Sequence, residues 1–411
     1  MKILHTADIH MNNKPQLLAD IVKCCDYLIT QAVQERPDLI VIAGDLYDEG
    51  VQLGSPASLA AIDFVYRCGN TAPTIIIRGT TSHDAEGSIN PLDKLKTVYP
   101  VYVTDRIEQV ALTDRGFTKV VDVDPPRAII SCLPSINKAN LMATLSGSVT
   151  DTSRETIYLV RDVLQGWGVD NDRTRQVGIP TILVGHGTVT GSQLSTGQTM
   201  AGKDLEYTTG DLKLAAADLN LLGHIHKAQS WGNTFYSGSI TRLNYGETEE
   251  KGFYIHEIKH NVMTTGHVPF LAESRFIETP ARSMRTKRPE GLPSVEIVED
   301  VQKGELVRIC YEVNEEDVGK VDEQAIIEAA MAKGAADVKI EKVIIPKVRV
   351  RAEGISQEHS LLAKLQKWGE TTGQAITVAV AEKLATIENA EIETVVDAYK
   401  EGTNEADQVA A

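Results

Sequence analysis

Five short segments of the chain contain residues that can bind a metal ion or move a proton. They are "TADIH" (6–10), "AGDLYD" (43–48), "GTTSHD" (79–84), "VGHGTVTG" (184–191) and "LGHIHK" (222–227). Carboxylates together with neutral imidazoles suit first-row divalent ions such as Mn²⁺, Fe²⁺ or Zn²⁺, whereas Mg²⁺ and Ca²⁺ prefer shells made of oxygen. A single H-x-H or D-x-H is weak support for a metal, but the recurrence of such residues predicts a metal site.

The chemistry that suits this set of residues is phosphoester hydrolysis. Five of the ten histidines lie in these segments together with Asp8 and Asp45, which is enough to hold two ions. Two metals roughly 3.5–4 Å apart can generate a nucleophile from water and stabilise both the attacking and the leaving oxygen of a phosphoryl centre. A purely structural role for the whole set is therefore the weaker interpretation.

Each segment follows an apolar run that is typical of a β-strand. The expected strands are 2–6, 39–45, 74–78, 128–133, 181–186, 219–224, 234–239 and 252–258. Between the first two, apolar residues from Leu17 to Val33 recur at helical spacing. Asp8 and His10 are two residues apart at a strand end, so the period of two along a strand is expected to put both side chains on one side. In layered α/β folds, functional groups gather at the carboxyl ends of strands.

The order of these elements predicts the domain organisation. Residues 1–273 are expected to form a layered, mixed-sheet α/β domain, because βα alternation gives way to antiparallel strands near 250–270. The basic, proline-bearing segment 274–293 is expected to be a linker. Residues 294–352 are expected to form a smaller α+β domain with a βαβ unit, and 353–411 a helical C-terminal segment.

Composition narrows the setting of the protein. The 411 residues are 42% hydrophobic, and no apolar run is long enough to span a bilayer, so we expect a cytoplasmic protein without a membrane partner. Five cysteines are scattered without C-x-x-C spacing, which predicts free thiols. The formal net charge of −16 argues against binding nucleic acid by bulk positive potential. A polyanionic substrate would have to be held by metal ions or by a basic partner.

The five segments resemble the signatures of a known family. "DIH", "GDLYD", "SHD", "GHGTVTG" and "GHIH" look like the five motifs of the calcineurin-like metallophosphoesterases. The stretch "YSGSITRLNYGE" (236–247) resembles a segment of SbcD-type exonuclease subunits, which are relatives of the double-strand-break repair nuclease. The resemblance covers about residues 1–350 and implies that the smaller domain is a capping domain.

This resemblance implies a role for each residue of the set. One metal would be bound by Asp8, His10 and His226, with Asp45 bridging to a second metal bound by His186 and His224. His83 would stabilise charge on the phosphate or protonate the leaving oxygen, with Asp84 as its orienting partner. The two divalent ions would be Mn²⁺.

The third segment departs from the family pattern, in which "GNHD" stands where this chain has "GTTSHD". The asparagine whose carbonyl should coordinate the second metal is absent. Either Ser82, directly before His83, takes its place, or Thr80 does in a loop two residues longer. We favour Ser82, because its position next to His83 preserves the relation between the metal and the acid. A hydroxyl ligand predicts weaker binding of the second metal.

The resemblance implies a metal-dependent nuclease subunit that hydrolyses DNA phosphodiesters, forms a homodimer and works with an SbcC-type ATPase. Two alternatives stay open, a small-molecule phosphodiesterase or phosphatase and a catalytically weak DNA-end scaffold. The basic residues between Arg282 and Arg288 either contact a nucleic-acid backbone or form a solvated face. Apolar residues between Leu361 and Trp368 either dock a partner or pack on their own domain.

Overall fold

The computed structural model describes residues 1–50, 52–119, 126–136, 152–195, 206–263, 266–346 and 354–389. The chain divides into two compact units, residues 1–311 with 322–341, and residues 312–321 with 342–411. Within the described ranges, no helix is both long enough and apolar enough to cross a membrane.

The first sheet of the larger unit has six strands. In order they are β15 (Gly266–Glu278), β14 (Gly252–Met263), β1 (Lys2–Thr6), β2 (Leu39–Ile42), β3 (Thr74–Ile77) and β4 (Val101–Thr104). Strands β1 to β4 are parallel to one another, whereas β14 runs antiparallel to both β1 and β15. The parallel part brings the carboxyl ends of β1, β2 and β3 to one edge, as expected for a mixed sheet.

The second sheet has seven strands and also combines both directions. In order they are β12 (Gln229–Trp231), β13 (Thr234–Tyr236), β11 (Leu219–Gly223), β8 (Thr181–His186), β7 (Ala128–Leu133), β5 (Glu108–Thr113) and β6 (Gly116–Lys119). The four strands β13, β11, β8 and β7 are parallel, and the outer pairings are antiparallel. A small parallel pair, β9 (Thr188–Val189) and β10 (Glu206–Tyr207), follows β8.

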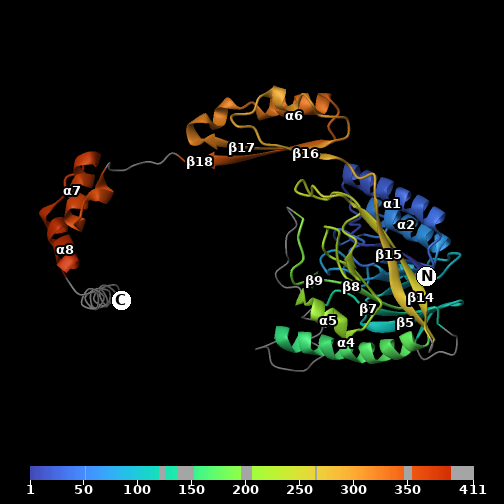
Figure 1. Cartoon of the computed structure of the whole chain (residues 1–411). Coiled ribbons are helices and arrows are strands. Elements are labelled where there is room, and N and C mark those ends of the chain that lie inside the picture. Colours follow the sequence, from blue (N-terminus) through green and yellow to red (C-terminus); the bar gives the residue numbers. More distant parts are fainter. Residues whose placement is uncertain are drawn as a thin grey trace, which may run out of the picture. The chain divides into compact units, whose positions relative to one another are not determined.

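The two sheets pack face to face with helices outside them. Alternate residues of β2 point to opposite faces, so Val41 lies in the core between the sheets while Ile40 lies in the core beneath the helices. Helices α1 (Pro15–Glu35) and α2 (Pro56–Thr71) cover the first sheet, and α4 (Thr152–Gln176) and α5 (Thr209–Leu214) cover the second (Figure 1). This arrangement confirms the layered, mixed-sheet α/β fold.

The later part of the chain holds a three-stranded sheet and further helices. The sheet has the order β16 (Met284–Lys287), β17 (Leu306–Asn314) and β18 (Asp337–Ile345), and α6 (Glu323–Ala332) lies between the last two strands in sequence. Helices α7 (Leu361–Thr372) and α8 (Val378–Asn389) follow. Short 3₁₀ turns occupy Asn90–Lys94, Val295–Val298, Glu315–Lys320 and Ile355–Gln357.

The segment expected to be a linker, 274–293, contains strand residues in the structure. Residues 274–278 of the expected linker continue β15, and Met284–Lys287 forms β16. The expected capping domain includes residues 347–352, and the C-terminal segment includes residues 390–411, all of which lie outside the described residues. The domain boundaries given above therefore stay a prediction.

A pair of buried histidines lies in the core between the sheets. His5 in β1 and His256 in β14 have ring centroids 5.7 Å apart, and Nε2 of His5 donates a hydrogen bond of 3.2 Å to the carbonyl of Leu222. Burial lowers the pKa of His5 to about 3, although this hydrogen bond opposes the shift. Burial also lowers the pKa of His256 well below its usual value. Both rings are therefore neutral in the folded protein near pH 7.

This pair predicts a loss of stability in acid. The unfolded chain binds protons at both histidines below about pH 6.5, whereas in the folded chain His5 does not until about pH 3 and the pKa of His256 is also lowered. The free energy of unfolding therefore falls as the pH falls below about 6.5. The substitution His5→Gln keeps an N–H donor for Leu222 and should flatten this dependence, as measured by urea unfolding at several pH values. The exposed His260 gives the control His260→Gln, and equal slopes for the two variants would contradict the account.

Candidate metal centre

The candidate ligands lie on loops with unusual backbone geometry. Six residues other than glycine have positive φ in the described part of the chain, and four of them are Asp8 (51°), His10 (54°), Asp45 (51°) and His224 (101°). Such values are uncommon for residues with side chains and gather at functional sites. The loops after β1 and β2 are joined by hydrogen bonds from the amides of Asp8 and His10 to the carbonyls of Gly44 and Asp45, each 3.1 Å long.

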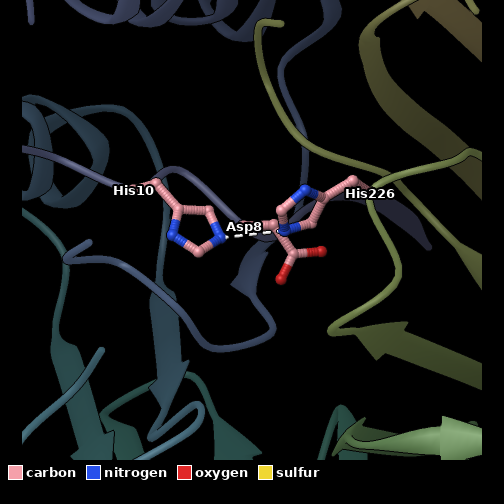
Figure 2. A group of neighbouring side chains, drawn as sticks. All are labelled: Asp8, His10 and His226. Carbon is pink, nitrogen blue, oxygen red and sulfur yellow. Dashed lines mark hydrogen bonds between the residues drawn. The ribbon is translucent and has the colours of Figure 1, made fainter. Parts of the chain in front are cut away.

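The first cluster consists of Asp8, His10 and His226, whose potential ligand atoms all lie within 4.8 Å of one another. Nε2 of His10 is 3.1 Å from Nε2 of His226, and the Asp8 carboxylate lies beside them (Figure 2). All three side chains are buried. Two imidazole nitrogens that face each other beside a carboxylate suit a shared cation, because without one at least one ring nitrogen must carry a proton toward the other.

The second cluster consists of Asp45, His186 and His224, again with potential ligand atoms within 4.8 Å. Oδ2 of Asp45 is 3.2 Å from Nε2 of His186. The same oxygen is 3.9 Å from Nε2 of His10 in the first cluster. Asp45 therefore lies between the two clusters, where one carboxylate can serve two ions.

The electrostatics of the second cluster favour a cation. Burial raises the pKa of Asp45, but the charge of His186 opposes this and the net shift is downward, so this carboxylate stays ionised. Burial lowers the pKa of His186, but the charge and hydrogen bond of Asp45, together with the charge of Asp8 and the contact with Ala43, outweigh it and raise this pKa to about 9. Burial and then the charge of His186 lower the pKa of His224 to about 3. A divalent ion can take the place of the proton on His186, so these residues fit a metal.

His226 is held by a buried ion pair behind it. Its Nδ1 donates a hydrogen bond of 3.1 Å to Oε1 of Glu247, and Oε2 of Glu247 lies 2.8 Å from Nζ of Lys251. Both partners are fully buried. Burial raises the pKa of Glu247, but the hydrogen bond from His226 and the charge of Lys251 bring it down to about 2. This contact fixes the tautomer that leaves Nε2 unprotonated toward the cluster. Lys251 was not among the residues expected from the sequence. Its position four residues after Glu247 is nevertheless a pattern that indicates an ion pair between the two.

Two further imidazoles are oriented by contacts of their Nδ1 atoms. Nδ1 of His186 donates a hydrogen bond of 2.7 Å to the carbonyl of Ala43. Nδ1 of His10 lies 3.2 Å from Oδ1 of Asp48. Each contact directs Nε2 of the ring to the cluster.

His83 is placed near the first cluster, but its orienting partner differs from the one expected. Its ring centroid is 4.7 Å from that of His10, and its Nδ1 donates a hydrogen bond of 2.5 Å to the carbonyl of Asp48. The Asp84 carboxylate instead accepts hydrogen bonds from the amides of Gly79, Tyr47 and Leu46 at 2.9, 3.0 and 3.3 Å. The prediction that Asp84 orients His83 is therefore wrong. The Asp84 carboxylate instead joins the loop after β2 to the loop after β3. Burial and the charge of Asp45 raise the pKa of Asp84 to about 6.

The loop after β3 brings Thr80 to the second cluster, in place of the expected Ser82. Oγ1 of Thr80 is 3.3 Å from Nε2 of His186 and 3.4 Å from Nδ1 of His224. Among the described residues, Ser82 makes no hydrogen bond to either cluster. The reason is a turn, in which the amides of His83 and Asp84 both donate to the carbonyl of Thr80, at 2.9 and 2.8 Å. The structure therefore places Thr80, and not Ser82, beside the second cluster, while the identity of the ligand stays a prediction.

The contact between Glu247 and His226 predicts an effect on metal affinity. The substitution Glu247→Gln keeps the side-chain shape but removes the negative charge that orients the His226 imidazole, so Mn²⁺ affinity should fall by about 10–100-fold. Titration calorimetry measures this, with circular dichroism to check the fold. The exposed Glu250 offers the control Glu250→Gln. Unchanged affinity in a folded Glu247→Gln protein would show that the pair only stabilises the loop.

The chain is similar to proteins of known name. The SbcD subunit of the SbcCD nuclease from Staphylococcus epidermidis is 28% identical over 272 residues, which cover 64% of this chain and 67% of that protein. The same subunit from Staphylococcus saprophyticus is 27% identical over 66% of this chain and 69% of its own length, and that from Escherichia coli K12 is 25% identical over 62% and 64%. A family model of the calcineurin-like phosphoesterases matches residues 1–228, which contain both clusters and His83. The chain therefore belongs to the calcineurin-like phosphoesterase family.

Proposed function

We propose that this protein is a metal-dependent DNA nuclease subunit that hydrolyses DNA phosphodiesters during end processing, repair or recombination. The observation that carries the proposal is the buried carboxylate of Asp45 between two clusters of metal-binding side chains. The names of the relatives, which denote a nuclease, support the choice of DNA as substrate.

The proposed ligands are divided between two divalent ions, with Mn²⁺ as the metal. Asp8, His10 and His226 hold the first ion, Asp45 is shared, and the second cluster holds the other. When bound, such a pair activates water and stabilises charge on the attacking and leaving oxygens. A donor set of two carboxylates and four imidazoles favours Mn²⁺ over Mg²⁺.

His83 supplies the acid in this proposal. Because its Nδ1 donates to the carbonyl of Asp48, the imidazolium form presents its second N–H through Nε2. A phosphate oxygen or the leaving oxygen can accept that hydrogen bond. The ring is only partly buried, which leaves it accessible to a substrate.

The basic residues near Arg285 and the net charge of the chain indicate which groups would attract the DNA phosphates. Arg285 pairs with Glu305 and Asp300, each at 2.9 Å, and Lys287 also pairs with Asp300. These ion pairs favour a structural role for the basic segment over a contact with nucleic acid. With a net charge of −16, we propose that the metal ions and a basic partner surface attract the phosphates.

The relatives' names denote one subunit of an SbcCD complex, and we extend this to an SbcC-type ATPase as the partner here. We further propose a homodimer, a cytoplasmic location, a capping domain at 294–352 that shapes substrate access, and partner docking by α7 and α8. Coexpression with the ATPase and size-exclusion chromatography test the assembly.

The activity is tested with Mn²⁺, end-labelled linear DNA and a nitrophenyl phosphodiester, with the ATPase partner supplied. The protein should degrade the DNA, and His83→Ala should lower the rate by about 10²–10⁴-fold, because it removes a general acid. The variant His260→Ala is the matched control, since His260 is an exposed histidine of β14.

Each other outcome of this assay points to a different function. Hydrolysis of the nitrophenyl ester alone would replace the nuclease by a small-molecule phosphodiesterase, for which the acidic surface is no obstacle. Absence of turnover of both substrates would favour a DNA-end scaffold. Equal rates for His83→Ala and His260→Ala would remove His83 from the mechanism.

A further inference from the structure

We propose that the hydroxyl of Thr80 is a fourth donor of the second metal site, beside Asp45, His186 and His224, and that this neutral donor makes the second site the weaker of the two. The inference rests on the metal assignment of the proposed function. In this chain the hydroxyl of Thr80 would take the place of the asparagine carbonyl of the family pattern. The weaker second site would then bind its ion after the first site.

The first support is the convergence of distances on one atom. Oγ1 of Thr80 lies 3.3 Å from Nε2 of His186, 3.4 Å from Nδ1 of His224 and 3.4 Å from Oδ2 of Asp45. A hydroxyl has one proton to donate, so it can donate to only one of these three atoms at a time. An ion placed among the four atoms would satisfy all of them together.

The second support is that the backbone fixes Thr80 independently of its side chain. The amide of Thr80 donates a hydrogen bond of 2.6 Å to Oδ1 of Asp45. Directly before it, a Cβ on Gly79 would lie 2.1 Å from the backbone nitrogen of Asp45, so only glycine permits this approach. The turn that returns the amides of His83 and Asp84 to the carbonyl of Thr80 completes the placement. The backbone that carries this hydroxyl is therefore held in position before any ion binds.

The third support concerns charge and predicts the difference in affinity. The first cluster has its own carboxylate, Asp8, and a second carboxylate, Glu247, hydrogen-bonded to His226. The second cluster has only the shared Asp45, while His186 is oriented by the neutral carbonyl of Ala43. Fewer negative charges around a divalent ion mean weaker binding. The first cluster therefore fills before the second as the metal concentration rises.

The test is Mn²⁺ titration of the full chain by calorimetry, together with electron paramagnetic resonance of the loaded protein. The wild type should bind two ions with unequal affinities and show coupling between two neighbouring Mn²⁺ ions. Thr80→Val, which keeps the shape but removes the oxygen, should weaken the second site by roughly tenfold or more. At stoichiometric Mn²⁺ it should show mostly the signal of a single ion. Thr80→Asn, which restores an amide carbonyl, should bring the two affinities closer together.

Two variants of the same loop are the controls. Ser82→Ala and Thr81→Val remove neighbouring hydroxyls and should leave both Mn²⁺ affinities unchanged. Circular dichroism and thermal unfolding show whether each variant is folded, and the shared amide contact to Asp45 remains in all of them.

The outcomes separate this inference from the proposed function. If the wild type binds two ions and Thr80→Val binds them equally well, the role of Thr80 is refuted while the two-metal site stands. If Ser82→Ala loses the weaker ion, Ser82 is the ligand instead. If the wild type does not bind two ions, the metal assignment and this inference both fail, whatever the DNA assay gives.

Discussion

The arrangement of the centre depends on one buried carboxylate, that of Asp45. It lies at the point where loops from both sheets meet, within 4 Å of His186 from the second sheet and of His10 from the first. The amide of Thr80 donates to it from a third loop. Removing such a charge from water is costly unless cations or hydrogen bonds surround it. The crossing of these loops is thus built around a charge that needs compensation, and the proposed pair of metal ions would provide it.

The segment 236–247 contacts the candidate metal centre through Glu247, which accepts a hydrogen bond from His226. The contacts of Arg242 in the same segment show how the loop is held. Arg242 donates to the carbonyls of Glu247, Glu249 and Arg282, at distances from 2.9 to 3.1 Å. These bonds close the loop that presents Glu247 to His226. Arg242 therefore shapes the loop, and Glu247 orients the proposed ligand His226.

Much of this could be predicted from the sequence, because buried parallel strands are near-continuous apolar runs and the functional groups directly follow them. Strand β1 has the expected bounds, and β2 ends three residues earlier than expected, at Ile42. The reason given for the proximity of Asp8 and His10 was wrong. They lie beyond the strand in a loop, where positive φ angles rather than strand alternation direct the side chains.

The errors share one physical cause, which is that turn geometry depends on tertiary contacts. Ser82 is next to His83 in sequence, yet the turn closed on the carbonyl of Thr80 brings Thr80 to the cluster. Asp84 also follows His83, but three backbone amides from other parts of the site attract its carboxylate. The positions of Thr80 and Asp84 cannot be predicted from sequence spacing. Each depends on the close approach of Gly79 to the backbone of Asp45.

The most direct test of the central claim is a crystal structure of the protein grown with Mn²⁺, with anomalous diffraction recorded near the manganese absorption edge. The account predicts two anomalous peaks, one beside Asp8, His10 and His226 and one beside His186 and His224, with Asp45 contacting both. A single peak, or two peaks without Asp45 between them, would contradict it.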